Sequence, residues 1–217
     1  MNIKRTRILI ADVHPIVRTG MRKTLEETPD LRIVYDAGNA EELLKILNEE
    51  IVDMVLMELD LSGGNTFDTL KRIKQNWPQI PIVVFTDKAE ELYALRLIRA
   101  GVSAYIIKET EVAVLIEILR KVATGKKHIT TRQSELLAEA FIEPDRTDAP
   151  LHELLTDREF QILFMLASGL RKAEIAENLQ LSKNTVGNHR NNIFKKMNFA
   201  TNSELTRYAI RQGIIKL

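Results

Sequence analysis

The side chains best suited to chemistry lie near the C-terminal end of the chain, in residues 182–197. Successive residues of a helix are about 100° apart, so the apolar residues of this segment share one face. These apolar residues are Val186, Ile193 and Met197. The opposite face holds the amides and the amine of Asn184, Asn188, Asn191 and Lys195. Amides and amines in register can bond base edges and phosphates, so the segment predicts a nucleic-acid-binding helix.

A second group of polar side chains follows the apolar runs of the N-terminal half. Asp12 and Glu58 are carboxylates, Lys108 supplies an ammonium group, and Val13 and Thr86 stand at comparable positions. Each lies where a predicted strand ends. Because the C-terminal ends of parallel strands meet at one edge of a sheet, we expect these residues to lie close together. Glu58 can then pair with Lys108 and approach Thr86.

The elements that position this second group alternate between strand and helix through residue 125. Strands are predicted at 7–11, 32–36, 54–59, 80–85 and 104–107. Helices are predicted near 16–27, 40–49, 66–76, 89–100 and 111–124. Most of the strands are continuous apolar runs, as expected of parallel strands covered on both faces. The pattern predicts an α/β, flavodoxin-like, doubly wound (βα)5 domain.

The polar helix at the other end belongs to a group of four short helices. They are predicted at 156–169, 172–179, 182–197 and 203–212. Thr156 and Glu159 form a capping box for the first, and Ser182 is a good N-cap for the third. Asn202 or Ser203 caps the fourth. An all-α four-helix domain with an exposed, polar third helix is typical of a helix-turn-helix module.

These patterns predict two domains and a connection between them. The α/β domain covers residues 1–125, and the helical domain covers residues 151–217. Residues 126–150 connect the two, with a helix at 131–141 and a linker at 142–150. The linker contains two prolines and three acidic residues.

Three motifs of the helical domain occur in a specific order: Leu155-Thr-x-Arg-Glu, Glu174-Ile-Ala-x-x-Leu and Ser182-x-x-Thr-Val-x-x-His189. With these motifs, about residues 150–217 resemble the LuxR-type DNA-binding domain of NarL/FixJ-family response regulators. The resemblance implies a sequence-specific transcription regulator that binds double-stranded DNA. It also implies that Gly187, Asn188 and Asn191 contact bases.

Members of that family often have lysine at the first and third of these base-reading positions. Their absence here does not argue against DNA binding, but the family's usual target sequence is not implied for this chain. Asparagine pairs well with adenine, and Gly187 would permit close approach to the groove. The resemblance and the helix pattern together indicate the following DNA-binding residues: Lys183, Asn184, Thr185, Gly187, Asn188, Asn191, Asn192, Lys195 and Lys196. Among them, we expect Lys183, Lys195 and Lys196 to contact mainly phosphates.

The distribution of charge supports this assignment. Residues 183–217 hold seven basic residues and one acidic residue, a net charge of +6, whereas the whole chain has a net charge of +1. Concentrated positive charge attracts the phosphate backbone. It therefore favours DNA binding over the alternative that stays open, a protein-interaction adaptor that binds another regulator and does not read DNA.

The N-terminal domain resembles the receiver domain of response regulators through Ile-Ala-Asp-x-His-Pro at 10–15, Phe-Thr at 85–86 and Ile-Lys at 107–108. In that family, two acids after the first strand and an aspartate ending the third hold Mg²⁺, and that aspartate is phosphorylated. The resemblance implies that the threonine and lysine positions bond the phosphoryl group. It also implies that Tyr105 changes rotamer with them.

The chain departs from the receiver pattern at two decisive positions. Val13 replaces the second acid, and Glu58 replaces the phosphoacceptor aspartate. A divalent cation needs several oxygen ligands, so we expect Mg²⁺ to bind weakly or not at all and expect no other cofactor. A glutamate paired with Lys108 and near Thr86 would imitate part of the phosphorylated state. The sequence therefore predicts a degenerate phosphoacceptor pocket and activity that is independent of phosphorylation.

Other interpretations of this pocket stay open. Glu58 could be a structural ion-pair partner in a receiver that no longer switches. Genuine but unusual phosphorylation is a third reading, and Asp60, two residues later, is a candidate surrogate acceptor.

Binding by helix-turn-helix proteins usually uses a dimer on two half-sites, so we expect a homodimer. The resemblance implies a dimer contact on the last helix, formed by Leu205, Tyr208 and Ala209. Packing in the domain's own core is the alternative for these side chains. A second candidate contact is the receiver face that includes Leu115, Ile118 and Val122.

Missing motifs and the composition argue against several other classes of protein. No phosphate-binding glycine motif or paired catalytic groups support an enzyme. No apolar run approaches the ~20 residues of a membrane span, and no signal peptide precedes the first strand. Together with the absence of cysteine, this predicts a cytoplasmic protein without a membrane partner. The other partners that we consider are a protein partner and a vestigial sensor kinase.

Overall fold

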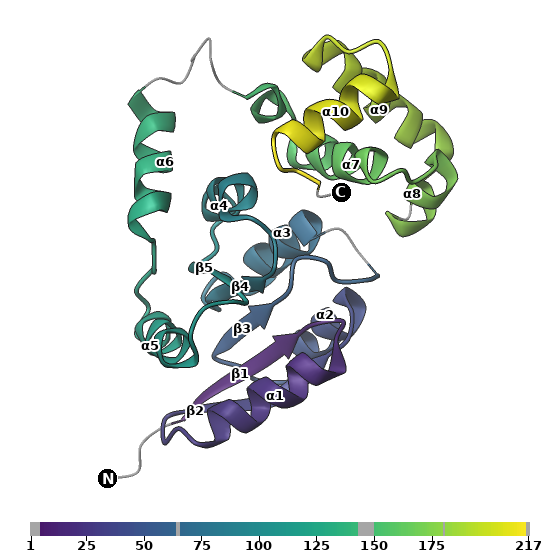
Figure 1. Cartoon of the computed structure of the whole chain (residues 1–217). Helices are drawn as coiled ribbons and strands as arrows, with labels where there is room; N and C mark the ends of the chain where they lie inside the picture. Colours follow the sequence, from purple (N-terminus) through teal and green to yellow (C-terminus); the bar gives the residue numbers. More distant parts are fainter. Residues whose placement is uncertain (1–4, 64–65, 143–149, 180, 216–217) are drawn as a thin grey trace. The chain divides into compact units, whose positions relative to one another are not determined.

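The computed structural model describes residues 5–63, 66–142, 150–179 and 181–215. The chain forms two compact units, Met1–Phe141 and Ile142–Leu217 (Figure 1). The first unit extends past residue 125, because the connecting helix packs with it. Most of the predicted linker, and Lys216 of the basic segment, lie outside the described residues.

The first unit is built on a parallel sheet of five strands in the order β2-β1-β3-β4-β5. The strands are β1 (Thr6–Ala11), β2 (Leu31–Ala37), β3 (Met54–Met57), β4 (Ile82–Thr86) and β5 (Ala104–Ile107). This order confirms the flavodoxin-like, doubly wound fold. The third strand ends earlier than predicted, because Glu58 and Leu59 leave the ladder after Met57 and enter the loop that forms the site.

Helices cover both faces of this sheet. They are α1 (Pro15–Glu26), α2 (Ala40–Glu49), α3 (Thr66–Asn76), α4 (Glu90–Arg99) and α5 (Val112–Ala123), and α6 (Thr131–Ile142) follows them as the connecting helix. One apolar core contains buried leucines of α2, α3 and α4, and the other contains those of α1 and α5. Leu115, Ile118 and Val122 are buried in the second core, so they pack within the unit and do not form an exposed contact face.

The second unit is helical, as predicted. It comprises the short 3₁₀ helix η1 (Leu151–Leu154), α7 (Asp157–Ala167), α8 (Lys172–Asn178), α9 (Lys183–Met197) and α10 (Asn202–Arg211). The capping box of Thr156 and Glu159 is present, and the Ser182 hydroxyl accepts from the backbone of Thr185. The predicted cap of α10 is wrong: Thr201 is the N-cap and forms a capping box with Glu204.

None of the helices in the described ranges combines the length and apolar character needed to cross a membrane.

Candidate functional site

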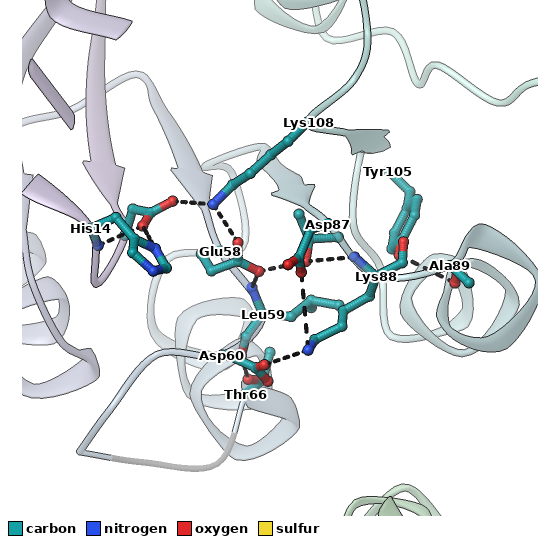
Figure 2. Close-up of polar contacts among 12 residues, drawn as sticks. His14, Glu58, Leu59, Asp60, Thr66, Asp87, Lys88, Ala89, Tyr105 and Lys108 are labelled. Carbon is teal, nitrogen blue, oxygen red and sulfur yellow. Dashed lines mark hydrogen bonds and ion pairs between the residues drawn. The ribbon is translucent and has the colours of Figure 1, made fainter. Parts of the chain in front are cut away.

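Four of the predicted pocket residues meet at the C-terminal edge of the sheet, and Figure 2 shows Glu58 and Lys108 among them. Asp12 follows β1, Glu58 follows β3, Thr86 ends β4 and Lys108 follows β5. The Lys108 ammonium lies 2.6 Å from Glu58 Oε2 and 2.6 Å from Asp12 Oδ2. The Thr86 hydroxyl donates to Glu58 Oε1 over 2.5 Å. The structure thus places Glu58 against Lys108 and Thr86, as the sequence predicted.

The two carboxylates are almost fully buried and are held by several donors. Asp12 is 2% exposed and Glu58 is 4% exposed. The backbone N–H of Leu59 also donates to Glu58, and the backbone N–H of His14 donates to Asp12. Burial lowers the pKa of the Lys108 ammonium, but the hydrogen bonds to both carboxylates and their charges raise it by more. The pKa of Lys108 therefore lies above its ordinary value. Lys108 is therefore a charged bridge between the carboxylates.

The donor set of this pocket does not fit a divalent cation. Val13 offers an isopropyl group that packs against the apolar core instead of an oxygen ligand. Lys108 contacts one oxygen of each carboxylate, and the other oxygen already accepts from His14 in Asp12 and from Thr86 and Leu59 in Glu58. Elsewhere in the described ranges, no group of three or more histidine or acidic side chains is arranged to hold a metal ion.

The sequence analysis missed an ion pair beside this pocket. The Lys88 ammonium lies 2.7 Å from Asp60 Oδ2, which joins the loop after β3 to the loop after β4 (Figure 2). Burial lowers the pKa of the Lys88 ammonium, but the hydrogen bond and charge of Asp60, with the charges of Asp87 and Glu58, raise it above its ordinary value. Asp60 is 64% exposed in its side chain and engages Lys88.

Tyr105 adopts a buried position behind the pocket. The residue is 2% exposed, and its hydroxyl donates to the carbonyl of Lys88 over 2.8 Å (Figure 2). Burial raises the pKa of this hydroxyl well above its ordinary value, and nearby phenol and carboxyl groups add to the effect. The tyrosine is therefore a neutral donor, and it bonds the loop that follows Thr86.

A buried amide extends this polar network to the connecting helix. Gln133 of α6 is 1% exposed, and its Nε2 donates to Glu90 Oε1 over 2.5 Å and to the carbonyl of Tyr105 over 3.4 Å. Thr130 also donates to Glu90. No sequence signal links these residues, because their partners are 28 to 43 positions away in the chain. The contacts fix the start of α6 to α4 and β5.

In the second unit, α9 presents the predicted polar face. Val186, Ile193 and Met197 are buried, which confirms the predicted apolar face. The exposed side chains of the helix include Lys183, Asn184, Asn188, Asn191, Asn192, Lys195 and Lys196. Thr185 and Gly187 are partly exposed. The residues predicted to contact DNA therefore lie on one helix, but not all of their side chains are free to contact DNA.

Lys196 is the exception in this group. Its ammonium lies 2.6 Å from Oε2 of Glu159, a side chain that is 4% exposed and also accepts from the backbone of Thr156. Burial raises the pKa of Glu159, but the hydrogen bond from Lys196 and those from Thr156 lower it below its ordinary value. Lys196 thus neutralises a buried carboxylate, a role that the sequence analysis did not assign.

We expect Lys196→Met to reduce the free energy of unfolding by about 1–2 kcal/mol at pH 7, because Glu159 loses its charged partner. A lowered carboxyl pKa adds stability above its ordinary value near 4.5, so the loss should shrink as the pH falls below that value. Urea unfolding followed by circular dichroism measures it. The exposed neighbour Lys195→Met is the control, and an equal loss there would contradict this role.

The apolar residues of α10 pack inside their own unit. Leu205 and Ala209 are completely buried, so the core alternative holds for both. Tyr208 is half-buried, and its hydroxyl accepts from the backbone of His152 and lies 2.9 Å from the ring nitrogen Nδ1. A dimer contact on this helix stays a prediction, and it would have to use the exposed face that carries Arg207.

Comparisons with known proteins identify the family of each domain. The family of response regulator receiver domains matches residues 8–120, and the luxR family of bacterial regulatory proteins matches residues 153–209. The fold and the sites therefore define a receiver domain followed by a LuxR-type helix-turn-helix domain. The chain belongs to the NarL/FixJ family of response regulators.

Individual relatives match along most of the chain. Response regulator UvrY of Escherichia coli strain K12 is 30% identical over 95% of this chain and 94% of its own length. Response regulator GacA of Pseudomonas aeruginosa is 30% identical over 96% of this chain and 97% of its own length. RcsB from Salmonella enterica serovar Typhimurium, solved bound to a promoter in the presence of phosphomimetic BeF3⁻, has a TM-score of 0.72 at 22% identity. That match covers 94% of this chain and 98% of RcsB, and it shows a shared fold.

Proposed function

We propose that this chain is a sequence-specific DNA-binding transcription regulator whose receiver is held in its active arrangement by Glu58, without phosphorylation. The observation that carries the proposal is the pair of contacts made by the Glu58 carboxylate. It accepts from the Thr86 hydroxyl and pairs with the Lys108 ammonium. The family resemblance assigns these two groups to the phosphoryl oxygens.

The mimicry would be partial. A carboxylate has one negative charge, whereas an acyl phosphate has nearly two. The buried position of Tyr105, bonded to the loop after β4, supports the same reading, since the resemblance links its rotamer to Thr86. Val13 and the bridge through Lys108 argue against the metal-dependent alternative, in which the receiver is phosphorylated in the ordinary way.

DNA binding is supported by α9 itself. Its exposed amides and lysines form the kind of surface that contacts base edges and phosphates. The net charge of +6 over residues 183–217 would attract the phosphate backbone. A protein-interaction adaptor would need neither feature. We also propose a homodimer on two half-sites, which is the usual arrangement of helix-turn-helix proteins.

The test is capture of sheared genomic DNA by the untreated full-length protein, followed by sequencing of the bound fragments, with and without prior acetyl phosphate. We expect the same fragments to be enriched in both conditions. Lys195→Ala should weaken binding to all of them by a similar factor, because a phosphate contact carries no sequence information. Enrichment that depends on acetyl phosphate would refute phosphorylation independence, and no enrichment in either condition would favour the adaptor.

A further inference from the structure

The exposed face of α9 is unusually rich in carboxamides and lacks an available guanidinium group. Its exposed amides are Asn184, Asn188, Asn191 and Asn192. Within the described ranges, none of these four side chains has a hydrogen-bond partner. The single arginine of the helix, Arg190, is engaged elsewhere: its guanidinium stacks 4.0 Å from the centre of the Phe194 ring and donates to Asn202.

This difference matters because base-reading groups have distinct partners in the major groove. A carboxamide forms a bidentate pair with N6 and N7 of adenine, whereas arginine or lysine pairs with O6 and N7 of guanine. In helix-turn-helix proteins the N-terminal residues of the recognition helix approach the bases. Lys195 lies three turns into α9, away from its N-terminal end. Lys183 is at the N-terminal end, but it points about 100° away from Asn184 around the helix axis. Both lysines are therefore better placed for phosphates than for bases.

Gly187 adds a second, independent observation on the same face. It lies inside α9, one turn after Asn184 and one turn before Asn191. A Cβ atom built on Gly187 would have no atom of the protein within 4 Å. Packing therefore does not require glycine here, although glycine weakens a helix relative to alanine. The helix surface therefore has open space at Gly187, which we call the gap at Gly187.

We propose that α9 reads an A·T-rich half-site, in which Asn188 and Asn191 hydrogen-bond adenines and the gap at Gly187 receives the C5-methyl group of a thymine. This inference rests on the proposed DNA-binding function and names the base pairs that it reads. Residues 188 and 191 are about 4.5 Å apart along the helix axis, and stacked base pairs are about 3.4 Å apart, so the two amides reach neighbouring pairs.

The first test selects duplexes bound by the full-length protein from a randomised pool, and then alters the adenines of the selected half-site. Replacing adenine by 7-deazaadenine removes the N7 acceptor and keeps Watson–Crick pairing. We expect binding to weaken at least about fivefold at each read adenine. In Asn188→Ala the loss at one adenine should disappear, whereas Asn76→Ala, an exposed asparagine of the receiver, should keep it.

The second test uses the gap. Gly187→Ala should fold normally, since its methyl group meets nothing in the protein, but it should bind the selected site at least about fivefold more weakly. Replacing the contacted thymine by uracil should abolish that difference. Gly20→Ala is the matched control, because Gly20 lies inside α1 and also has no atom within 4 Å of a built Cβ. Its DNA affinity should equal that of the wild-type protein.

The outcomes separate this inference from the function on which it rests. A selected half-site that holds guanines at the read positions, or one that tolerates 7-deazaadenine, would overturn the A·T reading and leave specific DNA binding intact. Unchanged affinity of Gly187→Ala would overturn the role of the gap. Failure to select any sequence would overturn both the inference and the proposed function.

Discussion

Lys108→Ala is expected to reduce the free energy of unfolding of the receiver domain by about 3–5 kcal/mol. The Lys108 ammonium is the shared partner of two carboxylates that are 2% and 4% exposed, those of Asp12 and Glu58. Removing it leaves two like charges close together in a buried pocket. The Thr86 hydroxyl and the two backbone N–H groups that also donate to them carry no positive charge, and the His14 imidazole contacts only Asp12.

The pH dependence of this loss follows from the raised pKa of Lys108. A lysine whose pKa is higher in the folded state than in the unfolded state contributes stability below its ordinary value near 10.5. That contribution disappears only as the pH rises through the folded pKa. The difference between wild type and Lys108→Ala should therefore be constant from about pH 6 to about pH 9, and should shrink above about pH 10.5.

Urea unfolding followed by circular dichroism, at several pH values, measures this difference. Lys121→Ala, an exposed lysine of α5, is the control and should change stability by less than about 0.5 kcal/mol. Lys108→Met separates charge from volume, because it keeps most of the side-chain length and should be destabilised to a similar degree. A loss below about 1 kcal/mol in both Lys108 variants would show that the bridge contributes little.

The sequence predicted the parts of this molecule that depend on local pattern. Continuous apolar strands and capped helices give the doubly wound sheet and the four-helix domain, because period and burial decide these elements. The pocket was predictable for the same reason, since Asp12, Glu58 and Lys108 each lie directly after a strand that the sequence pattern indicates. Topology then brings them to one edge of the sheet.

Contacts between distant residues were not predictable in this way. Gln133 bonds Glu90, and Lys196 bonds Glu159, through side chains that look like ordinary polar surface residues in the sequence. Similarly, the apolar spacing of α10 is the same whether Leu205 faces its own domain or a second copy. Only the fold decides which, and it places Leu205 in the core.

The same limit applies to Glu58, whose contacts fit a phosphate mimic and also a structural ion pair. A change of charge at nearly constant shape distinguishes them. Glu58→Gln keeps an amide oxygen that can accept from Thr86, but it has no negative charge to offer Lys108. If Glu58 holds the receiver in the arrangement that permits DNA binding, we expect this variant to bind a selected site about 5- to 150-fold more weakly, the usual range for coupling between sites.

Fluorescence anisotropy with a labelled duplex measures the affinity, and thermal unfolding of the same sample checks that the variant is folded. Glu109→Gln, an exposed glutamate just beyond the pocket, is the matched control and should leave affinity unchanged. Because Val13 still offers no metal ligand, acetyl phosphate should not restore binding to Glu58→Gln. A folded Glu58→Gln with wild-type affinity would instead assign Glu58 a structural role, and would mean that the receiver no longer controls the DNA-binding domain through this pocket.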